Sequence, residues 1–162
     1  MKKLWLSLIN SIKLPQKRAV FTLNRIGMDI TVFYLFVFLA VASLPALLAQ
    51  ISAEKISGLY VHTLFVLIYF FIFYYLVIVV IVFSLLSIIA YIALLISRAL
   101  KRKLHYSILW KMSAFASTIP LILFTVLSFF MELSYGFLAL MIIFTLIILV
   151  RIILIYPARK GL

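Results

Sequence analysis

Few side chains in this sequence are of types that do chemistry, and the most informative is an arginine within an apolar run. Arg151 is the single charged residue in residues 137–156. Because a charge inside hydrocarbon is costly, it indicates either a functional group or a side chain that snorkels towards the headgroups. Two acids also stand beside apolar runs: Asp29, which could pair with Arg25 or Arg151, and Glu132, which could serve a proton or cation path. We favour the simpler interpretation for all three, a charge held at the membrane boundary.

Combinations of residues that catalyse reactions are not evident in the sequence. There is no cysteine, which excludes thiolate nucleophiles, iron–sulfur clusters and Cys-ligated zinc. The two histidines, His62 and His105, fall in different segments, and the three acids are scattered. His62 could titrate near neutral pH, but nothing near it in the sequence supports a pH sensor. We therefore expect a protein that is not an enzyme and that uses no metal or cofactor.

Pro120 interrupts an apolar run that is otherwise suited to a spanning helix. A proline removes one helical hydrogen bond and kinks the helix, and the neighbouring hydroxyls of Ser117 and Thr118 can occupy the carbonyls that are freed. Broken helices near the middle of the membrane are typical of transporters. Pro120 is therefore the main argument for transport in this sequence.

The basic residues indicate contact with anionic lipid. Lysine and arginine total 15 against three acids, which gives a formal net charge of +12. They cluster beside apolar runs, as at the cytoplasmic ends of membrane spans, and no basic face is large enough to follow a nucleic-acid backbone. We predict binding to anionic headgroups and no binding to nucleic acid. The residues assigned to this membrane surface are Lys2, Lys3, Lys13, Lys17, Arg18, Lys101, Arg102 and Lys103.

These side chains must be positioned by helices that lie in a membrane. Hydrophobic residues make up 69% of the 162 positions, charged residues 11%, and the mean hydropathy is +1.37, which no soluble domain of this size could accommodate. The composition predicts an all-α, polytopic integral membrane protein with a single membrane domain. We predict four transmembrane helices, with five as the alternative, at residues 30–49, 60–97, 112–131 and 137–156.

The second span decides between four helices and five. Residues 56–97 contain no Asp, Glu, Lys or Arg, and half of residues 60–75 are aromatic, as expected near a membrane interface. Two helices joined by an uncharged turn would place the following basic patch, residues 98–111, outside the cell. The interior of the run lacks the Gly, Pro or Asn that a tight turn favours. We therefore predict one crossing by a long or bent helix, tilted or packed at its aromatic end.

Residues 1–29 are predicted to form a cytoplasmic interfacial segment. An apolar stripe at helical spacing predicts a short amphipathic helix that lies flat on the membrane, and Pro15 ends or restarts that helix. The stripe comprises Leu4, Trp5, Leu8, Ile9 and Ile12, opposite Lys3, Ser7, Asn10 and Ser11. The run 30–49 that follows is long enough to remain as a span rather than to be removed with a signal peptide.

Small residues predict where the spans pack closely. Ser87, Ala90, Ala93 and Ser97 recur on one face of the second span, and Ser113 and Ser117 recur on the third. Small side chains let membrane helices approach one another. We expect these faces to pack within the molecule.

Two stretches of the chain resemble a known family. The first reads Ser11-Ile12-Lys13-Leu14-Pro15, then Phe21, Arg25-Ile26-Gly27 and a span closing on Ser43-Leu44-Pro45. The second reads Leu100-Lys101-Arg102-Lys103-Leu104-His105-Tyr106, with Leu109-Trp110-Lys111 and Ser117-Thr118-Ile119-Pro120. Both resemble the domain-of-unknown-function family 1189, integral membrane proteins of Firmicutes, some of which are labelled maltodextrin-utilisation proteins. Members commonly carry a larger insertion outside the cytoplasm after the first span, where this chain has only residues 50–58.

The resemblance implies a multi-pass protein of the bacterial plasma membrane, but no reaction and no ligand site. Combined with the basic clusters, it places both termini in the cytoplasm. Short loops, missing catalytic sets and ample lipid-facing surface favour a non-enzymatic accessory or scaffold subunit that packs beside another integral membrane protein. The alternative is a small transporter or transport accessory, with maltodextrin uptake suggested by the family labels.

Overall fold

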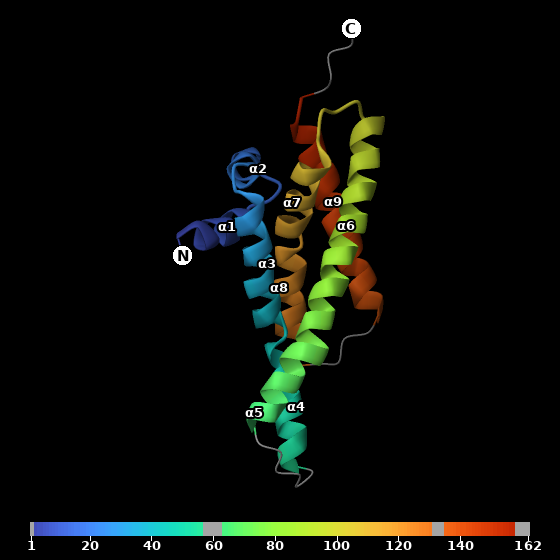
Figure 1. Ribbon diagram of the computed structural model, residues 1–162. Helices are drawn as coiled ribbons and strands as arrows, with labels where there is room; N and C mark the ends of the chain where they lie inside the picture. Colours follow the sequence, from blue (N-terminus) through green and yellow to red (C-terminus); the bar gives the residue numbers. More distant parts are fainter. Residues whose placement is uncertain (1, 57–62, 131–134, 158–162) are drawn as a thin grey trace.

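The protein is a bundle of helices in which four long apolar helices run roughly side by side (Figure 1). The computed structural model describes the backbone of residues 2–56, 63–130 and 135–157, and the side chains of residues 2–52, 64–130 and 136–157. Every regular element within these ranges is a helix, which confirms the predicted all-α class. The elements are α1 (Lys2–Ile12), α2 (Lys17–Asn24), α3 (Met28–Ala42), α4 (Leu44–Ile56), α5 (Thr63–Tyr69), the π-helix η1 (Phe70–Tyr75), α6 (Leu76–Ala99), α7 (Tyr106–Ala116), α8 (Thr118–Leu127) and α9 (Tyr135–Ile155).

Four helical stretches in the described residues are long and apolar enough to cross a membrane, as the sequence predicted. They are Met28–Ser52, Leu64–Ala99, Tyr106–Leu127 and Gly136–Ile155. The third stretch begins six residues before the predicted span 112–131, so it includes Lys111. The charge of Lys111 is accommodated there because its ammonium donates to the main-chain carbonyls of Asn24 and Ile26. A hydrocarbon layer forces each crossing segment to satisfy its own backbone hydrogen bonds, which is why apolar runs of this length form helices.

The uncharged run forms one helix without a turn over its described part. α5, η1 and α6 follow one another directly, so that residues 64–99 make a single helix of 36 residues. The six residues of η1 widen the helix locally, and five of them are aromatic. The five-span alternative required a hairpin in this run, and residues 64–99 contain none.

The α7–α8 helix is the central element of the bundle. Most of its length is buried, whereas the other three long helices bury a minority of their residues. α6 and α7 pack through small side chains, since Ala90, Ala93, Ser97 and Ser113 are all almost fully buried. The predicted packing of these small-residue faces within the molecule is therefore confirmed.

The two short helices α1 and α2 lie against one end of the bundle. α1 runs across the axes of the long helices, and α2 turns back beside it (Figure 1). α1 ends at Ile12 and α2 begins at Lys17, so the chain leaves the helix on both sides of Pro15, as predicted. Both helices contact α7. This packing positions α1 and α2, and with them the basic residues of the N-terminal segment.

Candidate functional site

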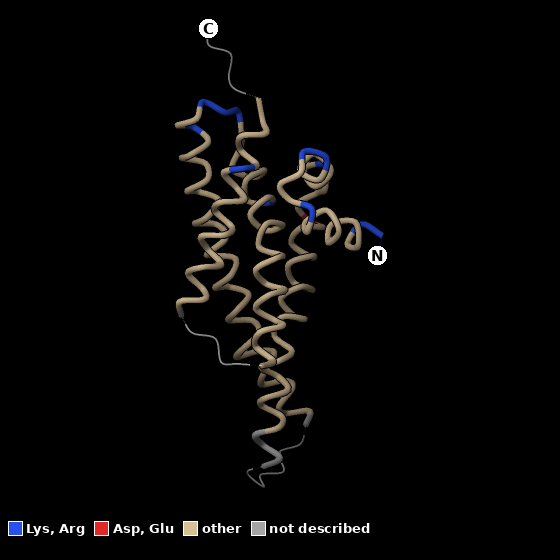
Figure 2. The backbone as a smooth tube through the Cα atoms, turned by 180° about the vertical axis from the view of Figure 1, so that it is seen from behind, with Lys and Arg blue, Asp and Glu red and all other residues tan. Residues whose placement is uncertain are grey.

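The lysines and arginines whose side chains the structure describes lie towards one end of the bundle, called the basic end below. Figure 2 shows them over α1, α2 and the connection between α6 and α7. The opposite end, called the far end, is formed by α4, α5 and η1 (Figure 1). Within residues 44–52 and 64–75, the part of the far end whose side chains are described, no residue is charged. The molecule therefore has the charge asymmetry that the sequence predicted for a membrane protein.

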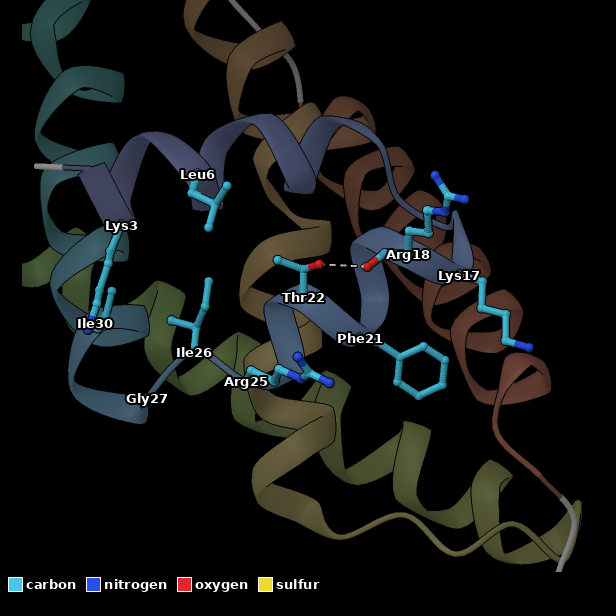
Figure 3. Close-up of a pocket in the computed structure, with 10 residues that line it drawn as sticks. All are labelled: Lys3, Leu6, Lys17, Arg18, Phe21, Thr22, Arg25, Ile26, Gly27 and Ile30. Atoms are coloured by element: carbon cyan, nitrogen blue, oxygen red, sulfur yellow. Dashed lines mark hydrogen bonds between the residues drawn. The ribbon is translucent and has the colours of Figure 1, made fainter.

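A groove at the basic end collects four of these cations. It is formed by α1, α2 and the start of α3, has a volume of about 840 Å³ and opens to the outside (Figure 3). The charged residues in its lining are all basic, and the rest of the lining is mainly apolar. The lining residues are Lys3, Leu6, Lys17, Arg18, Phe21, Thr22, Arg25, Ile26, Gly27 and Ile30.

The four cations of the groove are not used to hold the fold together. The side chains of Lys3, Lys17, Arg18 and Arg25 form no ion pair or hydrogen bond with any residue that the structure describes. The bond drawn in Figure 3 runs from the Thr22 hydroxyl to the main-chain carbonyl of Arg18, at 2.9 Å, and leaves the guanidinium of Arg18 unengaged. The four exposed cations therefore give the groove a positive charge that is complementary to an anion.

The wall that α1 contributes is set by its serines. Ser7 and Ser11 are fully buried, and each hydroxyl donates to the carbonyl four residues earlier, at 2.8 and 2.7 Å. Their small, internally bonded side chains let α1 pack closely on the bundle. The sequence placed these serines on a polar face opposite the apolar stripe; the structure instead buries the two serines against protein, whereas Lys3 of the same face is exposed. Trp5 and Ile12 point away from the bundle.

The wall that α2 contributes is held by a lysine from the central helix. The Lys111 ammonium donates to the main-chain carbonyls of Asn24 and Ile26, at 2.8 and 2.9 Å. These carbonyls lie at the C-terminal end of α2, where the helix dipole favours a cation. Lys111 therefore has a structural role, although the sequence grouped it with the membrane-facing basic patch.

Arg102 fastens the end of α9 in the same way. Its Nη1 donates to the main-chain carbonyl of Tyr156, directly after the last residue of α9. The side chain is half-buried, whereas Lys101 and Lys103 on either side are exposed. The connection between α6 and α7 thus presents one arginine to the protein and two lysines to the surroundings.

Two of the long helices are broken within their length. α3 gives way to α4 at Ser43, two residues before Pro45, and α7 gives way to α8 at Ser117, three residues before Pro120. The Ser43 and Ser117 hydroxyls each donate to a carbonyl three residues earlier, those of Ala40 and Ala114, both at 2.9 Å. The break predicted at Pro120 is present. The Ser117 hydroxyl bonds to the Ala114 carbonyl and the Thr118 hydroxyl to the Tyr34 hydroxyl, so neither occupies the carbonyl four residues before the proline.

A buried hydrogen bond joins the broken helices. The Tyr34 hydroxyl lies 2.9 Å from the Thr118 hydroxyl, and both residues are buried. One tyrosine therefore links α3 and α8 through a polar contact inside an otherwise apolar core.

The isolated charges predicted as intramembrane sites are not brought together. Asp29 is exposed in the first turn of α3 and pairs with neither Arg25 nor Arg151. Arg151 is exposed on α9, on the opposite side from the buried Leu149, Ile152 and Ile153. Glu132 and His62 lie outside the described residues.

The sequence pattern missed three groups that build the groove. Arg25, Phe21 and Gly27 line it, although none of them was assigned to the membrane surface. Their sequence signal was local: a basic residue and an aromatic residue one helical turn apart, followed by the glycine that starts α3. Only the packing of α1 against α2 shows that these residues surround one space.

Comparison with known proteins places the chain in a family without assigning an activity. No curated protein and no solved structure matches the chain. The family described as "Protein of unknown function (DUF1189)" matches residues 50–153, which extend from α4 to the last turn of α9. Since this match covers more than half of the 162 residues, the chain belongs to the DUF1189 family of proteins of unknown function.

Proposed function

We propose that this protein is a non-enzymatic accessory or scaffold subunit that packs beside a larger integral membrane protein. The observation that carries the proposal is the length of the helix formed by α5, η1 and α6. At 1.5 Å per residue, its 36 residues extend about 54 Å, against the roughly 30 Å of hydrocarbon in a bilayer. Part of this apolar helix therefore extends beyond the hydrocarbon of a flat bilayer, and its side chains must be buried against another apolar surface.

The neighbouring helices show which part extends too far. The helices Tyr106–Leu127 and Gly136–Ile155, of 22 and 20 residues, match one bilayer thickness at about 33 and 30 Å. The long helix shares its basic end with them, and its first third, α5 and η1, continues past their far ends (Figures 1 and 2). Even a 40° tilt, the upper end of the usual range, would leave the long helix about 41 Å tall.

The projecting segment is apolar on nearly every side. Val66 and Phe70 are buried and Leu67 is half-buried, whereas the other large side chains described between residues 65 and 74 are exposed. The exposed residues are Phe65, Ile68, Tyr69, Phe71, Ile72, Phe73 and Tyr74. A helix that is apolar all round is stable when other helices or lipid surround it, and large apolar patches outside lipid mark interaction sites. The far end is thus suited to a second membrane protein of comparable height.

A site-specific photocrosslinking experiment tests the proposal. Benzoylphenylalanine at Phe73, whose side chain is 63% exposed, is expected to give a crosslinked protein band of one recurring size in native membranes. The matched control is the same group at Val80, which is 57% exposed on α6 and lies in the part of the helix that the bilayer covers. Crosslinks to lipid alone at both positions would contradict an accessory role.

Transport is the second candidate, because two of the spanning helices are broken, as helices of transporters are. Against it, the residues at the second break are well packed: Thr118 is fully buried and hydrogen-bonded to Tyr34. Among the described residues no group of three His, Cys, Asp or Glu side chains could hold an ion. Deletion of the gene is expected to leave maltodextrin uptake intact; a loss of uptake that returns with the wild-type gene would favour transport over the accessory role.

A further inference from the structure

We infer that the groove between α1, α2 and α3 binds one molecule of an anionic phospholipid, held by its phosphate. This assignment is narrower than the attraction of any basic surface for an anionic membrane, because it places a single lipid among named residues. It is also independent of the accessory role, since it concerns the basic end of the molecule rather than the far end.

The groove lies where a lipid headgroup meets its acyl chains. Gly27 and Ile30 line it, and the spanning helix begins between them, at Met28. Beyond Ile30, the exposed side chains of Phe33 and Val37 continue along the same face of α3, at spacings of three and four residues. An acyl chain can therefore follow α3 into the hydrocarbon while the headgroup stays in the groove.

The cations of the groove surround its apolar floor from two helices. Lys3 comes from α1 and lies beside Ile30, whereas Arg18 and Arg25 come from α2 (Figure 3). The Arg25 guanidinium extends on the same side of α2 as the Phe21 ring, so an arginine and an aromatic surface face one space (Figure 3). A guanidinium binds phosphate oxygens in pairs with matched geometry, and apolar side chains accept the glycerol backbone and chains.

The charge of the groove is complementary to an anion, since all four of its cations are exposed and basic. Its lining contains four basic residues and no acid. Asp29 lines a neighbouring depression together with Lys2 and Lys3, and offsets one charge of the four at most. By contrast, the Lys111 ammonium donates to two main-chain carbonyls, and Nη1 of Arg102 donates to one. A ligand with a negative headgroup and an apolar body is the one that fits both parts of the lining.

Native mass spectrometry of the full-length protein in detergent tests this assignment with phosphatidylglycerol as the ligand. Titration of the wild-type protein is expected to show one lipid adduct that saturates before a second appears. The double substitution Arg18→Gln with Arg25→Gln is expected to weaken this adduct more than tenfold, since each basic residue near the surface contributes roughly fivefold to anionic-lipid affinity.

The matched control is Lys101→Gln with Lys103→Gln. Both double variants lower the formal net charge by two, from +12 to +10, but Lys101 and Lys103 are exposed in the connection between α6 and α7 and do not line the groove. The control is expected to bind the lipid within twofold of wild type. Equal losses in both double variants, or no loss in the groove variant, would show diffuse adsorption and overturn the assignment.

Two further arms complete the test. If the Arg18→Gln, Arg25→Gln protein fails to fold, Lys3→Gln with Lys17→Gln removes two other cations of the same groove and should give a comparable loss. Inorganic phosphate at the same concentration is expected not to displace the lipid, and phosphatidylcholine is expected to bind more than tenfold more weakly. Displacement by inorganic phosphate would identify a free anion as the ligand instead of a lipid and overturn the assignment.

Discussion

Lys101 closes α6 in a backbone conformation that favours glycine. Its φ of 52° is in the left-handed region, and its N–H donates to the Arg98 carbonyl while the Arg102 N–H donates to the Ser97 carbonyl, at 3.0 and 2.9 Å. This pair of bonds is the Schellman motif, which usually has glycine at this position because a Cβ there costs energy.

The substitution Lys101→Gly is therefore expected to stabilise the protein by about 1 kcal/mol. The measurement is thermal unfolding of the purified protein in detergent. Lys101→Ala serves as the control, because it removes the same charge but keeps the Cβ, and it should leave stability near that of wild type. Equal melting temperatures for the two variants would show that the left-handed conformation carries no cost here.

Lys111 stabilises the N-terminal helices from within a spanning helix. Replacement by methionine keeps most of the side-chain volume but leaves the carbonyls of Asn24 and Ile26 without their charged donor. Hydrogen bonds from charged groups contribute about 1.5–3 kcal/mol, so Lys111→Met is expected to destabilise the protein by about 2 kcal/mol. Lys103→Met, at an exposed site, should change stability by less than about 0.5 kcal/mol in the same unfolding assay. Similar effects of the two substitutions would refute the capping role.

At the scale of the elements, the contact between α3 and α8 depends on one buried hydrogen bond. Tyr34→Phe and Thr118→Val each remove one partner with little change of shape. Hydrogen bonds between membrane helices contribute about 0.6 kcal/mol on average and up to about 1.7 kcal/mol, so a double-mutant cycle should give a coupling energy in that range. Unfolding measurements on wild type, both single variants and the double variant provide the four values. Strictly additive losses would show that the two hydroxyls do not interact.

The orientation of α1 can be read from its tryptophan. Trp5 is 66% exposed and Trp110 is 6% exposed, and these are the two tryptophans of the chain. In vesicles with brominated lipid, fluorescence of the Trp110→Phe protein, which reports Trp5, is expected to be quenched more strongly than that of the Trp5→Phe protein. The reason is that α1 turns its serine face to the bundle and Trp5 to the membrane interface. Weaker quenching of Trp5 than of Trp110 would place this face of α1 in water.

The helices were predictable from the sequence, and the groove was not. Hydrocarbon allows only segments with internal backbone hydrogen bonds, so the long apolar runs predicted the four helices that are long and apolar enough to cross a membrane, and the small residues of α6 and α7 indicated their packing. The face of α1 that packs could not be predicted in this way, because Ser7 and Ser11 read as polar until their hydroxyls are seen bonded to their own helix. Lys111 and Asn24 are 87 residues apart, and only the tertiary fold brings their atoms together.

At the scale of the whole molecule, the charge asymmetry defines which way the protein faces. Basic residues resist translocation, so the basic end is expected on the cytoplasmic side and the far end outside. This orientation would place the groove against the cytoplasmic leaflet, whose anionic lipids are the proposed ligands. It would also turn the aromatic segment of α5 and η1 outwards, where the proposed partner would then contact it.

Single cysteines test this orientation directly, because the natural sequence contains none. Lys103→Cys places a thiol in the exposed connection between α6 and α7, and Ser52→Cys places one on the exposed surface of α4 towards the far end. A maleimide that cannot cross membranes is expected to label Ser52→Cys in intact cells, but to label Lys103→Cys only after the cells are made permeable. The reverse pattern would put the basic end outside, separate the groove from the cytoplasmic leaflet and require a partner that meets the far end from the cytoplasm.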